Sequence, residues 1–203
     1  MADVKIEDIR KLKELSGAGL TDAKKALVDA GGDFDKALAA MRQKGLTKAE
    51  KRGEREAREG VIDSYVHGGR IGVLVELNCE TDFVARTDEF KTLAHELCLQ
   101  IASMNPKWLS ENDVPADETA RKTDELKQAM DADAKNAKKP ADVKEKIVAG
   151  QLKKYFDELI LLNQNYWKDD SKTIGELVKE TAAKVGENIV VRRFARLELG
   201  VSE

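Results

Sequence analysis

Apolar residues recur every three or four positions in three successive stretches at the start of the chain. The apolar positions are Ile6, Ile9, Leu12 and Leu15 in the first stretch, Ala23, Ala26, Leu27 and Ala30 in the second, and Phe34, Ala37, Leu38 and Met41 in the third. This spacing puts the apolar side chains on one face of a helix. Glycines separate the stretches and interrupt helices. The pattern predicts a three-helix module over residues 1–45, with Thr21 and Asp33 as helix caps.

Residues 46–60 carry alternating charges and almost no apolar side chains. Lysines and arginines there could be read as an arm that binds nucleic acid. The interleaved acidic residues cancel most of that positive field, however, so a solvated helical linker is the favoured interpretation.

The periodicity changes to two after residue 60, which is typical of strands. Residues 61–66 and 71–77 alternate in this way on either side of Gly68-Gly69, a pair suited to a tight hairpin turn. Residues 189–197 are again β-branched and alternating, and could pair with this hairpin. The sequence therefore predicts a three-stranded antiparallel sheet.

Further helices are predicted around the sheet. One begins with Asp88 as its cap, and its apolar stripe can cover one sheet face; the stripe consists of Phe90, Leu93, Ala94, Leu97, Cys98 and Ile101. Residues 110–139 permit an exposed helix that supplies little core, and residues 143–162 fit a long amphipathic helix. Thr173 and Glu176 form a capping box for a last helix, which closes near Gly186. Residues 61–203 are thus expected to form an α+β core behind the helical module.

Charge and composition narrow the class of ligand. The formal net charge is −3, so the uncompensated basic clusters that nucleic-acid binding needs are missing, and a protein partner fits better. No apolar run approaches the length of about 20 residues that a membrane span needs. The first five residues also lack the features of a secretory signal. The expected location is the cytoplasm, without direct contact to nucleic acid or membrane.

The residues that could carry chemistry do not form a recognisable site. Cys79 and Cys98 make no CxxC pair and have no matching histidine cluster, so neither zinc nor a disulfide framework is indicated. A thiolate nucleophile needs a nearby base. His67 and His95 are the candidates, but no triad signature accompanies them. The glycine-rich segments lack the pattern of a phosphate-binding loop. The sequence therefore predicts no catalytic residue, no metal ligand and no cofactor.

One segment nevertheless stands out just past the end of a predicted strand: Asn78-Cys79-Glu80-Thr81-Asp82-Phe83-Val84-Ala85-Arg86. Together with residues 16–27, 31–37, 144–150 and 186–194, it closely resembles the elongation factor Ts family of translation factors. The resemblance covers most of the chain except residues 110–139. It implies a ubiquitin-associated-like N-terminal module and an α+β core, which agrees with the periodicity.

The resemblance also implies a function. Members of this family bind elongation factor Tu, a translational GTPase, and speed the loss of GDP without making or breaking a bond. By this likeness Thr81, Asp82, Phe83 and Val84 lie at the tip of the core. Phe83 would wedge into the partner's nucleotide-binding domain, with Asp82 close to its Mg²⁺ region. The turn and helix start at Gly17, Gly19 and Leu20 would be a second, weaker contact.

Several alternatives stay open. Phe83 could instead cap the core at the strand–helix junction, and Asp82 could be an ordinary helix cap. The three-helix module could be the working part of a peptide-binding adaptor. Longer family members carry a second core subdomain or a coiled-coil insertion. A short form could therefore act as a homodimer through the sheet that contains residues 189–197. The family's Gln-Pro-Phe segment is replaced here by Gln164-Asn165-Tyr166-Trp167, so its role is open.

Overall fold

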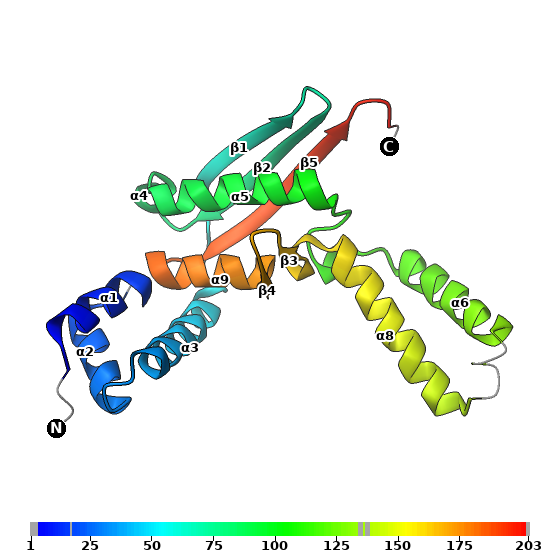
Figure 1. Ribbon diagram of the computed structural model, residues 1–203. Helices are drawn as coiled ribbons and strands as arrows, with labels where there is room; N and C mark the ends of the chain where they lie inside the picture. The colour runs from blue at the N-terminus through cyan, green and yellow to red at the C-terminus, as the bar shows by residue number, and fades with distance from the viewer. Residues whose placement is uncertain (1–3, 17, 134–135, 137–138, 202–203) are drawn as a thin grey trace.

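The computed structural model describes residues 4–16, 18–133, 136 and 139–201, with the backbone alone for residues 46–51. It confirms the α+β prediction: helices open the chain, and a three-stranded antiparallel sheet with packed helices follows. The N-terminal helices lie beneath one end of α9, α5 lies across the sheet, and a pair of long helices extends from the opposite side (Figure 1).

Three helices form the N-terminal part, as the periodicity predicted. They are α1 (Ile6–Ser16), α2 (Leu20–Asp29) and α3 (Phe34–Arg52). They share a small core of their own, which consists of Ile9, Leu12, Ala23, Leu27, Ala37 and Met41. Asp33 accepts a hydrogen bond from the backbone of Lys36, as expected of a cap. The prediction for Thr21 was wrong, because α2 already begins at Leu20 and Gly19 occupies its N-cap position.

Helix α3 continues through Gly45 and lies against α9 (Ile174–Val185). A Cβ atom at Gly45 would come within 3.2 Å of the Ala183 Cβ, closer than most such contacts. The absence of a side chain at this position therefore allows the helical module to sit close to the core.

The sheet has the order β1–β2–β5, so the predicted pairing of the last strand with the hairpin is confirmed. The strands are β1 (Glu59–His67), β2 (Ile71–Cys79) and β5 (Ile189–Glu198). Gly68 and Gly69 make the turn between β1 and β2 with φ values of 56° and 67°, which favour glycine. Both ladders are antiparallel, and the β2–β5 ladder ends at the pair Cys79 and Ile189.

Helix α5 (Asp88–Met104) covers one face of the sheet (Figure 1). Its predicted apolar stripe is buried, including Phe90, Leu97 and Ile101. The cap is one residue earlier than expected: the Thr87 hydroxyl accepts a hydrogen bond from the Phe90 amide at 3.3 Å, and Asp88 is the first helical residue. Threonine, like aspartate, is among the residues preferred at this position.

Helices α6 (Ala116–Ala132) and α8 (Ala141–Leu159) form an antiparallel pair that projects from the body (Figure 1). Residues 110–139 were expected to hold an exposed helix with little core, and α6 has Met130 as its buried residue. Ion pairs such as Arg121 to Glu118 lie on its surface. At the base of the pair, the Trp108 and Leu161 backbones connect the two chain segments through a hydrogen bond of 2.8 Å.

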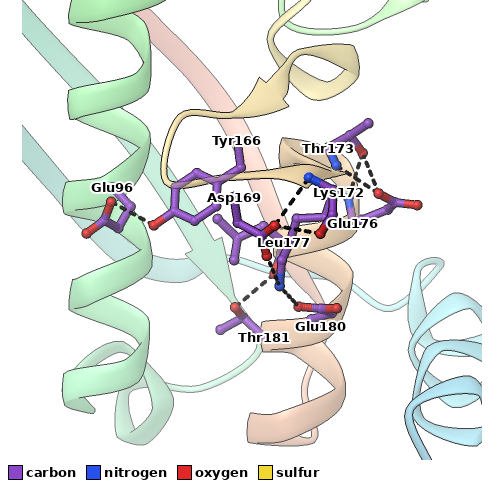
Figure 2. A network of polar contacts seen from close by, with 10 residues as sticks. Glu96, Tyr166, Asp169, Lys172, Thr173, Glu176, Leu177, Glu180 and Thr181 are labelled. Carbon is purple, nitrogen blue, oxygen red and sulfur yellow. Dashed lines mark hydrogen bonds and ion pairs between the residues drawn. The ribbon is translucent and has the colours of Figure 1, made fainter. Parts of the chain in front are cut away.

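A short hairpin of β3 (Asn165–Tyr166) and β4 (Asp169–Thr173) was not predicted. It follows Gln164, whose side chain is buried and accepts a hydrogen bond from Gln100 Nε2 at 3.1 Å. Figure 2 shows how the hairpin is attached: the Tyr166 hydroxyl donates to Glu96 on α5, and Lys172 pairs with Glu180 on α9. The segment that departs from the family pattern therefore contacts α5, and the hairpin as a whole connects α5 with α9.

The predicted capping box is present at the start of α9. The Thr173 hydroxyl accepts from the Glu176 amide at 3.2 Å, and the Glu176 carboxylate accepts from the Thr173 amide at 2.8 Å (Figure 2). Gly186 ends the helix with a left-handed φ of 82°, as the sequence predicted. Because β5 begins three residues later, this turn brings residues 187 and 188 next to the end of β2.

Candidate partner-binding site

A single helical turn, α4 (Asp82–Ala85), follows β2 and forms the tip of the core. Thr81 is its N-cap and accepts a hydrogen bond from the Val84 amide through its hydroxyl. Ala85 is buried, and Val84 packs partly against the main core. The Phe83 side chain, in contrast, is 79% exposed. The structure thus brings the four predicted site residues together, with the aromatic ring turned outward.

This geometry decides two of the open alternatives. Phe83 does not cap the core, because a ring that is 79% exposed contributes little to a buried cluster. Asp82 is not the helix cap, since Thr81 has that role. The Asp82 carboxylate instead pairs with Arg86 at 2.8 Å on the surface. Both side chains of that pair reach solvent, so the pair is worth little to stability.

The two thiols lie in the core. Cys79 and Cys98 are both fully buried. Burial and the nearby charge of Glu187 raise the pKa of Cys79 to about 11, and burial together with Asp63 raises the pKa of Cys98 to about 12. A thiol with so high a pKa is protonated at neutral pH and is a poor nucleophile.

The histidines have other partners than the thiols. His95 Nδ1 lies 3.2 Å from Asp63, and His67 Nδ1 lies 2.9 Å from the Tyr65 hydroxyl. Among the residues that the structure describes, no group of three or more His, Cys, Asp or Glu side chains is arranged to hold a metal ion. The same part of the chain contains no helix long and apolar enough to cross a bilayer.

The weaker predicted contact lies on the N-terminal module. Gly17 is outside the described residues. Gly19 is the N-cap of α2 and Leu20 is its first residue, with a side chain that is 55% exposed. Helices α1 and α2 and the tip helix α4 lie toward the same end of the molecule, with α9 between them (Figure 1). One partner could therefore reach both without spanning the whole protein.

Sequence reasoning missed one residue at the tip. Glu187, which precedes β5, accepts hydrogen bonds from the backbone of Glu80 and Thr81. Glu187 lies in residues 186–194, which carry part of the resemblance to the family, but that segment suggested no role for its side chain. Only the pairing of β2 with β5 could have indicated that it meets Glu80 and Thr81.

The fold and the tip define an α+β protein that presents a short aromatic segment at the end of a central sheet. The sequence profile of the family described as Elongation factor TS matches residues 46–201. The chain is 50% identical to "Elongation factor Ts" of Thermoanaerobacter sp. (strain X514) over 198 residues, which is 97% of this chain and 95% of that protein.

Two other relatives give the same result. "Elongation factor Ts" of Thermotoga petrophila is 50% identical over 199 residues, with 98% of this chain and 97% of that protein covered. That of Caldanaerobacter subterraneus subsp. tengcongensis is 48% identical over 198 residues, with 97% of each covered. The chain therefore belongs to the elongation factor Ts family of translation elongation factors.

Proposed function

We propose that this protein is a guanine-nucleotide exchange factor that binds elongation factor Tu and promotes the release of GDP. The observation that carries the proposal is the exposure of Phe83 on a helix whose other apolar residues pack inward. A large aromatic side chain has few rotamers, so it loses little conformational entropy when it is buried at an interface. Residues of this kind commonly dominate binding energy. Membership of the family supports the choice of partner.

The mechanism follows from the charge of the nucleotide site. A Mg²⁺ ion bound to GDP offsets the charge of the phosphate oxygens, so disturbing its coordination weakens nucleotide binding without contact to the base. Phe83 would enter between side chains of the partner's nucleotide-binding domain, and Asp82 would approach the Mg²⁺ region. Thr81 and Val84 would complete the contact. No covalent bond changes, so this role needs no catalytic group, cofactor or metal of the protein itself.

Linkage makes the proposal quantitative. If the factor weakens GDP binding to elongation factor Tu, GDP must weaken binding of the factor by the same free energy. Each tenfold change corresponds to about 1.4 kcal/mol. The factor should therefore bind nucleotide-free elongation factor Tu more tightly than the GDP-bound form. Such a cycle would operate in the cytoplasm, where translation takes place.

The N-terminal module provides a second contact in this proposal. Gly19 and the exposed Leu20 lie at the start of α2, where they are free of the module's own core. The module would dock on the partner's nucleotide domain and the tip would act on the nucleotide site. Gly17 was predicted for the same surface.

A homodimer through the open face of the sheet is the proposed working state. Helix α5 covers one face, whereas Ile62, Val66, Leu74 and Leu197 are exposed large apolar side chains. Ser64, Leu74 and Ala195 are directly paired across the three strands, and Val66, Gly72 and Leu197 make the next row. A two-fold axis would place the same apolar patch of both copies in contact. Sedimentation should show a dimer that Leu74→Lys converts to monomer, and monomer alone at working concentration would contradict it.

The experiment that tests the exchange function is the release of a fluorescent GDP analogue from elongation factor Tu. Addition of this protein should accelerate release. Phe83→Ala should reduce the acceleration by about 30-fold or more, since interface hot spots cost at least about 2 kcal/mol when truncated. Met104→Ala is a control, because it removes a half-exposed apolar side chain at the end of α5 opposite to the tip. It should leave the rate unchanged.

The alternative function is a ubiquitin-associated-like adaptor that binds peptides through the three-helix module. The exposed Ile6 and Leu20 side chains of that module are compatible with it. The same assay separates the two proposals. If wild-type protein does not accelerate release of the nucleotide, the exchange function is wrong and the adaptor is favoured.

A further inference from the structure

The backbone at the tip leaves the sheet before it enters α4. The β2–β5 ladder ends at the pair Cys79 and Ile189, so the amides of Glu80, Thr81 and Asn188 lie just beyond it. A backbone N–H group without a partner is costly when it is removed from water. Side chains of the same two segments accept these bonds in place of a continued ladder.

Glu187 accepts three hydrogen bonds from the tip. Its Oε2 accepts from the Glu80 amide at 3.1 Å and from the Thr81 amide at 3.0 Å. Its Oε1 accepts from the Thr81 hydroxyl at 2.6 Å. Bonds to an ionised carboxylate are shorter and stronger than bonds between neutral groups. One side chain thus fixes two consecutive residues immediately before α4.

The connection between the two segments is reciprocal. Glu80 Oε1 accepts from the Asn188 amide at 2.7 Å, while the Glu80 amide donates to Glu187. The Cys79 thiol donates to the Thr81 carbonyl at 3.1 Å. Thr81 is therefore held at its amide, its hydroxyl and its carbonyl, and it is the residue that caps the helix of Phe83.

The same corner holds the chain that leaves the N-terminal module. The Asn188 side chain is buried and donates to the carbonyls of Gly53 and Arg55 at 3.2 Å and 2.8 Å. Arg55 also pairs with Glu80 at 3.4 Å. The segment between α3 and β1 and the start of α4 are thus fixed against one pair of residues, 187 and 188.

The Phe83 ring contributes little to fixing the tip helix, because it is 79% exposed and lies outside the core. We propose that Glu187 is a positioning residue that keeps the tip helix, and with it Phe83, in the orientation that binds the partner. This inference rests on the proposed exchange function. If binding requires one orientation, the apparent affinity is the intrinsic affinity multiplied by the fraction of molecules that adopt that orientation. A preformed tip avoids that loss.

The test compares Glu187→Ala with Glu187→Gln in the complete protein. Alanine removes all three acceptors. Glutamine keeps one oxygen for the two backbone amides, and its amide nitrogen can donate to the Thr81 hydroxyl. Glu145→Ala is a control, since it removes an exposed carboxylate from α8, away from the tip. Thermal unfolding of each variant establishes that the sheet and α5 still form.

Two measurements are made. In the exchange assay, Glu187→Ala should require about tenfold more protein for half-maximal acceleration of GDP release, with a rate at saturation close to wild type. Glu187→Gln should stay within about threefold of wild type, because it keeps most of the hydrogen bonds. Amide hydrogen exchange of the free protein is the second measurement. The Glu80 and Thr81 amides should exchange at least about tenfold faster in Glu187→Ala, while amides in the middle of β2 stay protected.

The outcomes separate this inference from the proposed function. Wild-type protein that fails to accelerate GDP release overturns the exchange function itself. Active wild type with an equally active Glu187→Ala variant overturns only the positioning role, as does continued protection of the Glu80 and Thr81 amides in that variant. A lower saturating rate with an unchanged half-maximal concentration would also contradict positioning, because it would indicate that Glu187 acts after binding.

Discussion

Phe83 and Phe90 lie on consecutive helices of one chain and have opposite environments. Phe90 is fully buried in the stripe that α5 packs on the sheet, whereas Phe83 is 79% exposed on α4. Burying a phenylalanine side chain is worth roughly 1.5 to 3 kcal/mol relative to leaving it in water. Phe90 gives that energy to folding. Phe83 leaves its apolar surface available for the burial that a partner would provide.

The boundary between the two environments is a single corner. The Thr87 hydroxyl donates to the Val84 carbonyl of α4 at 2.8 Å and accepts from the Phe90 amide of α5 at 3.3 Å. The exposed turn and the buried helix are separate helices, because Arg86 ends α4 and the extended backbone of Thr87 precedes α5. If α4 and α5 formed one continuous helix, the Phe83 ring would follow the stripe of α5. This comparison shows that residue type alone does not determine which phenylalanine serves the core.

The largest expected effect comes from truncating each phenylalanine in turn and comparing the stability of the two variants. Phe90→Ala should lower the free energy of unfolding by about 3 to 5 kcal/mol, because it leaves a cavity in a closed core. Phe83→Ala should change it by less than about 0.5 kcal/mol, as surface substitutions usually do. Denaturant unfolding of both variants measures this. Similar costs for the two would break the comparison, since they would place Phe83 in the core.

The second largest effect is the pH dependence of stability that comes from Cys79, and it shows how far the buried environment extends toward the tip. Cys79 is two residues before Thr81 and fully buried, and its pKa is raised from 9.0 to about 11 by burial and by Glu187. The neutral thiol is thus favoured in the folded state. An unfolded chain releases this proton near pH 9, so the corresponding stability is complete below pH 9 and is lost as the pH rises toward 11.

Cys79→Ala removes this titration and keeps that of Cys98. The contribution of Cys98 therefore cancels when the variant is compared with wild type. Between pH 8 and pH 10.5, the wild type should lose more unfolding free energy than the variant does. The extra loss should be on the order of 2 kcal/mol, at about 1.4 kcal/mol per pKa unit. Denaturant unfolding at several pH values measures it. A difference that stays constant with pH would mean that water reaches the thiol, and that the buried environment ends before the tip.

Regular patterns made most of the fold predictable. Alternation gave β1, β2 and β5 because one sheet face is buried by α5, and the glycines at the turn matched its positive φ values. The Thr173 capping box was readable because both partners lie within one turn. The β3–β4 hairpin was not predictable in this way. Its strand Asp169–Thr173 is polar, and it is held by contacts such as Lys172 to Glu180 that involve another element.

The candidate site was only partly predictable for a related reason. The segment from Thr81 to Val84 was found through its resemblance to a family, but its periodicity could not show whether Phe83 faces the core or solvent. That depends on the turn at Thr87, and the cap there was itself predicted one residue late, at Asp88. Glu187 was not found, because its contact with Glu80 and Thr81 joins segments far apart in the sequence.

The smallest expected effect concerns the corner that separates the two phenylalanines. Thr87→Ala removes the cap of α5 and the bond to the Val84 carbonyl, and should cost about 1 kcal/mol of unfolding free energy. Thr87→Ser keeps the hydroxyl and should recover most of that loss. Because α4 would lose one of its attachments, acceleration of GDP release should fall a few-fold in Thr87→Ala and return in Thr87→Ser. If stability falls but exchange stays at the wild-type level in both, the orientation of Phe83 does not depend on this corner, and the bonds that hold Thr81 would be sufficient to maintain it.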